Sequence, residues 1–322
     1  MLLIFGMPRS GTTWLGKIFD SHPNVLYLHE PDSEKQLKRV PLLVTNNYYS
    51  NYRKLIWEYC SNLLSKCTTR VNGKTPFFNK SYLSTIQYLF FKLNLLGAKV
   101  LEKFGLTIAI WNPYVSNVSN NVVVVWKSIE SCGRLGLIMN ALQDCKTIYI
   151  IRHPCGQIAS VLKGEESGKF SSDVSASNDY ALIESLLNSK YSMQNDLTLE
   201  EIKKMDPIAR LAVRWVLFNE QALEDIELSG VRGMIIRYED ICVDPTHEIK
   251  KMFNFAGLKW NNQTKKFIEH SISNHSSAYY SVFKNPEAAM SKWKTFFTND
   301  EIDIIKKIIK TSNAGKLFVD NF

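Results

Sequence analysis

The stretch FGMPRSGTTWL, residues 5–15, decides which fold this sequence predicts. Gly6 and Gly11 bracket four residues, as two glycines do in the phosphate-binding pattern G-x-x-x-x-G-K-[ST]. Thr12 stands where that pattern has its lysine, and a different cation, Arg9, lies inside the loop. A nucleoside triphosphatase needs the loop lysine to reach the terminal phosphates. The stretch therefore predicts an anion-binding loop of another kind.

The flanks of this loop explain why it would hold an anion. The apolar LLIF before it predicts a buried strand, and TTWLGKIFDSH after it has the apolar spacing of a helix that ends at HPN. Such a turn directs backbone N–H groups and the positive end of the helix dipole at one point. Ser10, Thr12 and Thr13 add hydroxyl donors, and the fork of Arg9 suits phosphate or sulfate oxygens. A plain strand-to-helix turn with capping hydroxyls is the alternative.

Composition limits the classes of protein to which the chain can belong. Its 322 residues with 45% hydrophobic content suffice for one large domain, 1–322, and we find no linker or repeat that divides it. A formal charge of +8 suits an anionic ligand, although solubility alone would explain it. Without a dense Lys/Arg run with interleaved aromatic residues, we expect no nucleic-acid partner. Six cysteines without a C-x-x-C pair predict reduced core residues.

Two apolar stretches bear on localisation. MLLIF at the start is too short for a signal peptide, so we expect a cytoplasmic protein. The segment 86–111 is interrupted by Lys92, Lys99, Glu102 and Lys103, so we expect no stable membrane insertion. It predicts an amphipathic packing helix, with a helix that skims a membrane as the alternative.

Alternating strands and helices predict an α/β fold: a P-loop-like three-layer arrangement with a central parallel sheet flanked by helices. NVLYL and CKTIYIIRHP (145–154) predict strands, and the valines of NNVVVVWK (120–127) suit a strand buried on both faces. GMIIRYEDI (233–241) predicts a further strand. Helices are expected after Pro154, from Pro207, and from an N-cap at Thr298 or Asn299.

The segment 164–179, GEESGKFSSDVSASND, is rich in serine, glycine and aspartate. Such a composition predicts a mobile loop. Two interpretations stand side by side: a lid over a substrate, or a surface insertion.

PRSGTTWL resembles the loop that binds the 5′-phosphosulfate in sulfotransferases that use 3′-phosphoadenosine 5′-phosphosulfate (PAPS), in the arginine form of the carbohydrate and tyrosylprotein enzymes and their soluble bacterial-type relatives. The resemblance implies the sulfotransferase fold, PAPS as co-substrate and an acceptor hydroxyl or amine. It also implies that the loop residues contact PAPS. These are Arg9, Ser10, Gly11, Thr12, Thr13 and Trp14.

Further segments extend this resemblance over most of the chain. In YIIRHPCGQIASVLKG, Arg152 and Ser160 are similar to the pair that grips the 3′-phosphate. IIRYEDICVDP is similar to a segment that would place Tyr238 near the nucleotide, although Glu239 and Asp240 would also serve as local caps. NPEAAMSKW is similar to a late segment of the tyrosylprotein enzymes and implies that Lys292 contacts PAPS and that Trp293 packs.

The resemblance also implies a catalytic set. HEP (29–31) lies where these enzymes place a glutamate, which makes Glu30 the candidate base, and Lys127 matches a catalytic lysine. A carboxylate would take the proton of the attacking hydroxyl. Lys127 and Arg9 would stabilise the charge that develops on the leaving oxygen. The plain alternatives are a salt-bridged glutamate and a solvated lysine, and His29 or His153 would be rival bases.

Other functions stay open at this point. No His/Cys/Asp cluster has metal-ligand spacing, so we expect no metal site. A P-loop kinase that uses ATP, or an inactive PAPS-binding protein, would explain part of the pattern. Without a recognisable anchor segment, a small metabolite or a glycan is the expected acceptor, its pocket drawn from 30–40, 86–96 and the loop at 164–179. The oligomeric state is not predicted.

Overall fold

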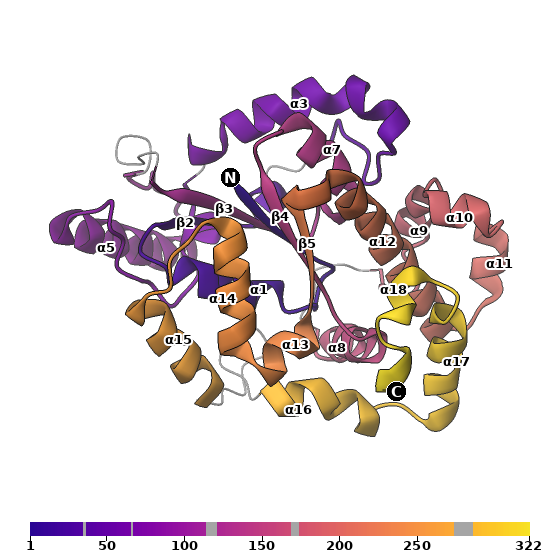
Figure 1. The fold of residues 1–322 in the computed structure, drawn as a ribbon. Helices are drawn as coiled ribbons and strands as arrows, with labels where there is room; N and C mark the ends of the chain where they lie inside the picture. Colours follow the sequence, from indigo (N-terminus) through magenta and orange to yellow (C-terminus); the bar gives the residue numbers. More distant parts are fainter. Residues whose placement is uncertain (35–36, 66, 114–120, 169–173, 274–285) are drawn as a thin grey trace.

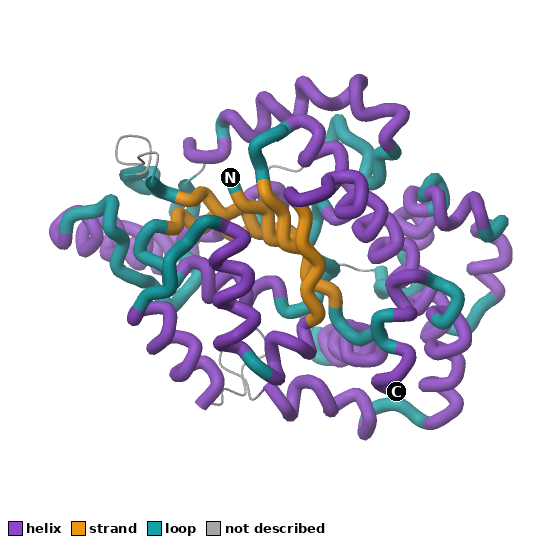
Figure 2. The backbone as a smooth tube through the Cα atoms, viewed as in Figure 1, coloured by secondary structure: helices purple, strands orange, loops and turns teal. Residues whose placement is uncertain are grey.

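A central sheet of five parallel strands organises the chain (Figures 1 and 2). The computed structural model describes residues 1–34, 37–65, 67–113, 121–168, 174–273 and 286–322. The strand order is β2-β3-β1-β4-β5. The strands are β1 (Leu2–Phe5), β2 (Val25–His29), β3 (Val123–Ser128), β4 (Lys146–Ile151) and β5 (Gly233–Arg237). The predicted α/β fold with a parallel sheet flanked by helices is confirmed.

Helices cover both faces of the sheet, as Figure 1 shows. On one face lie α1, α14 and α15, and on the other lie α3, α7 and α12. The helices are α1 (Thr12–Asp20), α2 (Pro31–Glu34), α3 (Tyr49–Ser61), α4 (Thr69–Asn72), α5 (Thr85–Glu102), α7 (Leu135–Ala141), α8 (Pro154–Glu166), α9 (Tyr180–Leu186), α10 (Lys190–Gln194), α11 (Leu199–Lys204), α12 (Pro207–Ser229), α13 (Tyr238–Val243), α14 (Pro245–Ala256), α15 (Asn262–Ser273), α16 (Pro286–Ser291), α17 (Asn299–Ile309) and α18 (Asn313–Lys316).

The first strand shows how the two layers of core arise. Successive side chains of a strand point to opposite faces. Leu2 and Ile4 belong to the core under α1, and Leu3 and Phe5 belong to the core under α12. All four are buried, as expected for a central strand covered on both faces.

Helix ends follow the sequence signals closely. Thr298 caps α17 in a capping box with Glu301, and Pro207 occupies the first turn of α12. At the other end of α12, Gly230 has a positive φ of 58°, which glycine adopts without strain. These predicted helices are confirmed.

Three sequence predictions need correction. The strand predicted over 233–241 ends at Arg237, because Tyr238–Val243 forms α13 with two acidic residues in its first turn. Val122, Val123 and Val124 are only partly buried, and full burial of β3 begins at Val125. The loop predicted over 164–179 begins late, because α8 continues to Glu166.

Part of that predicted loop, 169–173, lies outside the described residues, while 174–179 contain neither helix nor strand before α9 begins. Among the described residues, none of the six cysteines forms a disulfide, and all but the half-buried Cys67 are buried. Among the described residues, no helix is both long and apolar enough to cross a membrane.

Candidate functional site

The loop between β1 and α1 has a tightly constrained backbone. Arg9 adopts φ of 74° and Gly11 adopts φ of 92°, both in the left-handed region. A Cβ atom on Gly11 would lie 2.4 Å from the ring of Tyr238, and one on Gly6 would lie 2.5 Å from the carbonyl oxygen of Ile150. Only glycine therefore fits at these two positions, and the loop lies directly on its neighbours.

The helix that follows the loop begins with its N–H groups open to a ligand. Gly11 is the N-cap of α1 and has no side chain with which to cap it. The first-turn N–H groups of a helix have no partner within the helix, and they carry the positive end of its dipole. Ser10 and Thr12 are buried beside this end. Gln157 of α8 donates to the carbonyl oxygen of Pro8 at 2.9 Å and fixes the other side of the loop.

Arg152, just after β4, binds the backbone of the loop. Its Nη1 donates to the carbonyl oxygen of Arg9 at 2.9 Å, and its Nη2 donates to that of Ala289 at 2.9 Å. Its guanidinium lies 4.8 Å from the ring centroid of Tyr238. The Nε atom is buried and has no hydrogen-bond partner among the described residues. A buried N–H of this kind fits an anionic oxygen that arrives with a ligand.

The structure brings together most of the residues predicted for the nucleotide. Ser160 of α8 accepts a hydrogen bond from Arg9 Nε at 3.0 Å, so Arg9 joins Arg152 and Ser160 in one cluster. Thr13 follows the uncapped start of α1. Trp14 packs edge-on against Tyr238 and donates to Ser271 Oγ at 3.2 Å. Its indole N–H is therefore already used by the protein.

The late segment reaches the cluster through an aromatic stack. Trp293 stacks on His153 with ring centroids 4.7 Å apart and 9° between the planes. Burial, and then the charge of Arg152, lowers the pKa of His153 to about 3, so its imidazole is neutral. Lys292 is exposed in the short 3-10 turn beside Trp293, and its ammonium group makes no hydrogen bond or ion pair among the described residues. Glu239 accepts from the backbone N–H of His153 at 3.1 Å, as the capping interpretation predicts.

A second cluster lies at the carboxyl end of β2 and β3. His29 is level with Lys127 across the two strands, and Glu30 continues the pairing by donating its N–H to the carbonyl oxygen of Lys127 at 2.8 Å. Glu30 then turns with φ of 49°. Its side chain forms a buried ion pair in which Lys127 Nζ donates to Glu30 Oε1.

This cluster lies beside the anion-binding loop. Lys127 pairs with Ile4 of the neighbouring strand β1. The loop begins at Gly6, two residues after Ile4. Because ligands of parallel sheets bind outside the carboxyl ends of the strands, the loop and the Glu30–Lys127 pair face the same region.

The charges around Glu30 decide its protonation. Burial raises the pKa of Glu30, but the charge of Lys127, with smaller contributions from His29 and Arg70, outweighs it and lowers the pKa to about 2. Glu30 is therefore a carboxylate at neutral pH. Burial, followed by the charge of Lys127, lowers the pKa of His29 to about 3. The neutral His29 ring is held by a 2.8 Å hydrogen bond between its Nδ1 and the hydroxyl of Tyr27.

Asp32 joins the site without having been predicted. It is fully buried and accepts from Trp126 Nε1 at 3.3 Å, from Ser131 Oγ at 2.7 Å and from Ser128 Oγ. These bonds tie the turn after Glu30 to the turn after Lys127. The sequence shows only an acid two residues after Glu30, so its partners, about a hundred residues away, could not be foreseen.

Two further cations near Glu30 were also missed. Arg70 of α4 lies 3.7 Å from Glu30 Oε2. The pKa of Lys74 is lowered, first by burial and then by the charge of Lys127. Both come from a segment without any recognisable motif, and only the packing of α4 on β2 brings them to the site.

The structure also bears on a metal site. Within the described parts of the chain, no three His, Cys, Asp or Glu residues lie close enough together to hold a metal ion.

Comparisons with known proteins agree on one family. A sequence model described as "Sulfotransferase domain" matches residues 1–317. Carbohydrate sulfotransferase 3 of Mus musculus is 32% identical over 65 residues, which cover 20% of this chain and 14% of that protein. The Homo sapiens protein of the same name is 31% identical over 65 residues, with the same coverage of 20% and 14%. The matched segment is thus a small part of these longer relatives.

Among solved structures, a sulfotransferase domain from the curacin biosynthetic pathway aligns with a TM-score of 0.45 and 14% identity, over 96% of both chains. A mouse sulfotransferase complexed with PAP aligns with a TM-score of 0.47 and 12% identity, over 99% of this chain and 88% of that chain.

Proposed function

The chain belongs to the sulfotransferase domain family, and on that premise we propose that it transfers a sulfuryl group from PAPS to the hydroxyl of an acceptor. One observation supports this most strongly. A buried carboxylate–ammonium pair, Glu30 and Lys127, lies at the same edge of the sheet as an anion-binding loop. An inactive PAPS-binding protein would need the loop but not the pair, so the pair favours an enzyme.

The loop and the Arg152 cluster would hold the two ends of the nucleotide. The N–H groups at the start of α1, the hydroxyls of Ser10, Thr12 and Thr13, and the guanidinium of Arg9 would surround the 5′-phosphosulfate. The unpartnered Nε of Arg152 and the hydroxyl of Ser160 would bind the 3′-phosphate. Tyr238 would support both parts, because it packs against Gly11 and Arg152. Lys292 would need to turn inward to join them.

The reaction needs one proton acceptor and one stabilised leaving oxygen. Glu30 would accept the proton of the acceptor hydroxyl while the hydroxyl oxygen forms its bond to sulfur. The bond between sulfur and the bridging oxygen breaks, and its electron pair stays on the phosphate of adenosine 3′,5′-bisphosphate (PAP). Lys127 and Arg9 would stabilise that negative charge.

The same ion pair links the two events. Lys127 lowers the pKa of Glu30, whereas burial raises it. When the ammonium of Lys127 turns toward the developing charge on the leaving oxygen, its hold on Glu30 weakens and burial dominates. Glu30 then becomes a stronger base as the leaving group forms.

Ligand preference tests the proposal before any acceptor is known. Thermal melting would be followed with PAP and, separately, with ATP plus Mg²⁺. A ligand that binds only the folded state raises the melting temperature. PAP should raise it in the wild type and leave Arg152→Ala unaffected.

Arg232→Ala is the matched control, because Arg232 also donates to two backbone carbonyl oxygens, of Met139 and Gln143, but it precedes the start of β5, at the edge of the sheet opposite the loop. It should respond to PAP like the wild type. Stabilisation by ATP plus Mg²⁺ and not by PAP would contradict the proposal and favour the kinase.

A further inference from the structure

The helix α5 packs with only one of its faces. Figure 1 shows it at the β2 side of the molecule, where it extends beyond the sheet. Phe91, Leu95 and Ala98 are buried and share one side of the helix. Contacts with α4 hold this side: Thr69 Oγ1 donates to Glu102, and Lys99 Nζ donates to the carbonyl oxygen of Gly73.

The outward face of α5 is apolar, contrary to the usual pattern of a surface helix. We call Ile86, Leu89, Phe90, Leu93, Leu96 and Val100 the α5 stripe. Their spacing of three and four residues places them on one side, and all are exposed, Ile86 at 80% and Leu93 at 67%. The stripe continues into the turn after the helix, where Phe104 is 76% exposed.

An aromatic residue from the following segment borders the stripe. Trp111 packs edge-on against Phe90 with ring centroids 5.4 Å apart, and its backbone N–H donates to Asn94 Oδ1 at 2.9 Å. The Trp111 side chain is itself partly exposed. An exposed tryptophan beside an apolar stripe is typical of helices that lie in a membrane interface.

Positive charge follows one flank of the stripe. Lys92 and Lys103 are eleven residues apart, about three turns, so they share one side of the helix. Lys99 lies between them, but its ammonium is bound to the carbonyl oxygen of Gly73. Lys92 and Lys103 form no ion pair within the described ranges. The acid of this helix, Glu102, faces α4.

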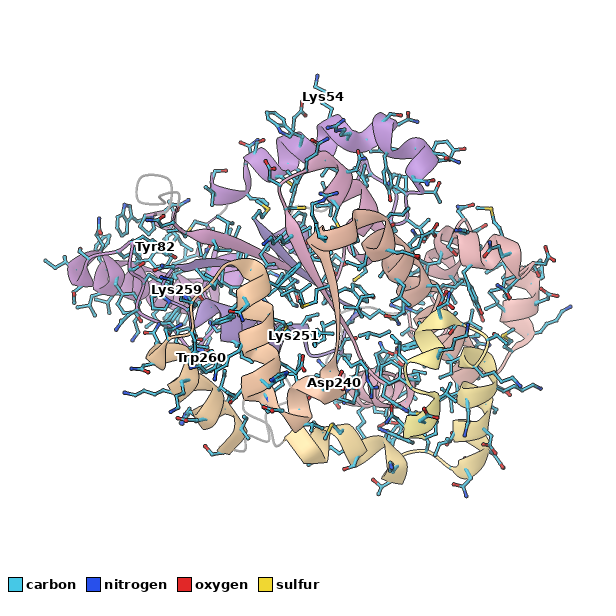
Figure 3. All side chains as sticks on the ribbon, in the orientation of Figure 1. Lys54, Tyr82, Asp240, Lys251, Lys259 and Trp260 are labelled. Carbon is cyan, nitrogen blue, oxygen red and sulfur yellow. The ribbon has the colours of Figure 1, made fainter. Side chains whose placement is uncertain are left out.

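The outer face of α3 shows the contrast. Figure 3 shows Lys54 extending outward from α3, and its Nζ lies 3.9 Å from Glu58 Oε1. Mixed charges of this kind are ordinary for a solvated helix.

We propose that the α5 stripe docks this protein on the surface of an anionic lipid bilayer, with its apolar side chains at the acyl boundary and Lys92 and Lys103 against the headgroups. The charge pattern favours this occupant over a second copy of the chain. Pairing two such stripes would bring lysines close together with no acidic side chain of the stripe to neutralise them. Anionic headgroups neutralise them directly.

The docked bilayer would lie close to the reaction. Within α4, Thr69 binds Glu102 of α5 while Arg70 lies 3.7 Å from Glu30. The stripe is thus separated from the candidate base by α5 itself and the short helix α4. This step rests on the proposed function: sulfuryl transfer would take place at the lipid surface.

Co-sedimentation with vesicles tests the docking without any activity. Two preparations would be compared, phosphatidylcholine alone and phosphatidylcholine mixed with phosphatidylglycerol. The wild type should bind the mixed vesicles and bind the neutral ones much more weakly. Leu93→Asp should weaken binding by about tenfold or more, because an apolar contact with the bilayer is lost. Lys92→Gln and Lys103→Gln should each weaken it by about fivefold.

Matched controls distinguish an effect of the α5 stripe from the effect of the same substitution at an exposed position elsewhere. Val231 is 93% exposed and lies outside α5, so Val231→Asp should bind as the wild type does. Lys54→Gln serves the same purpose for the lysines. Equal sedimentation of the wild type and Leu93→Asp would overturn the proposal. So would a dimer, seen by analytical ultracentrifugation without vesicles, that Leu93→Asp dissociates. PAP binding is measured separately, so failure of docking and failure of the proposed function are told apart.

Discussion

At the scale of single residues, the contacts of Asp32 are visible in the structure but could not be predicted from the sequence. Its carboxylate collects three donors from β3 and the turn after it. We expect Asp32 to act as a positioning residue that keeps Glu30 and Lys127 in register. Glu30 itself could be predicted, because a motif marks it. Asp32 could not, because its meaning lies in partners brought near by strand pairing.

Asp32→Asn is therefore expected to reduce kcat by about tenfold to a hundredfold, since small misplacements of catalytic groups cost that much. The amide offers one acceptor oxygen in place of two, so a donor is left unpaired. The KM for PAPS should stay within about twofold, because the nucleotide contacts lie at the loop. Ser131→Ala, which removes one donor, should show a smaller effect on kcat. Equal losses in kcat and PAPS affinity would instead indicate a general structural defect.

At the scale of elements, the loop between β1 and α1 depends on glycine for two separate reasons, backbone conformation and space. Gly11→Ala should lower the free energy of unfolding by about 2 kcal/mol or more, since strain at φ of 92° adds to a clash with Tyr238. It should also weaken PAP binding. Urea denaturation and a PAP titration would measure these effects.

Gly105→Ala measures the contribution of backbone conformation alone. Gly105 has φ of 75°, but a Cβ atom there would meet nothing within 4 Å. It should lose only the backbone contribution, about 1 kcal/mol, and bind PAP normally. Equal losses in the two variants would show that the contact between Gly11 and Tyr238 is unimportant.

Elements were predictable where local signals agree. β1, β2, α1 and α17 follow from apolar spacing and caps. The end of β5 could not be predicted, because IIRYEDI suits a strand by composition. Only the acidic residues in the first turn of α13 favour a helix there. Similarly, the valines of β3 indicate a strand but not how much of it neighbouring elements cover.

At the scale of the whole molecule, the parallel sheet and the meeting of Arg9, Arg152 and Ser160 could be predicted, because carboxyl ends of parallel strands share an edge. The outward face of α5 could not. Its sequence is apolar on two sides, and only the packing with α4 decides which side is buried. The sequence offered two interpretations of this segment, a packing helix and a helix that skims a membrane. The first describes the inner face of α5, and the proposed docking on a bilayer concerns its outer face.

We propose that Glu30 and Lys127 perform sulfuryl transfer from PAPS. The most direct test measures transfer of labelled sulfate from PAPS to acceptors in an extract of lipids and polar metabolites, for the wild type, Glu30→Gln and the control Glu58→Gln. Glu30→Gln should lose about a hundredfold or more in rate while it binds PAP normally. Because the pKa of Glu30 is about 2, protonation of this carboxylate should not slow the wild type down to pH 5. Full transfer by Glu30→Gln would show that Glu30 is not the base.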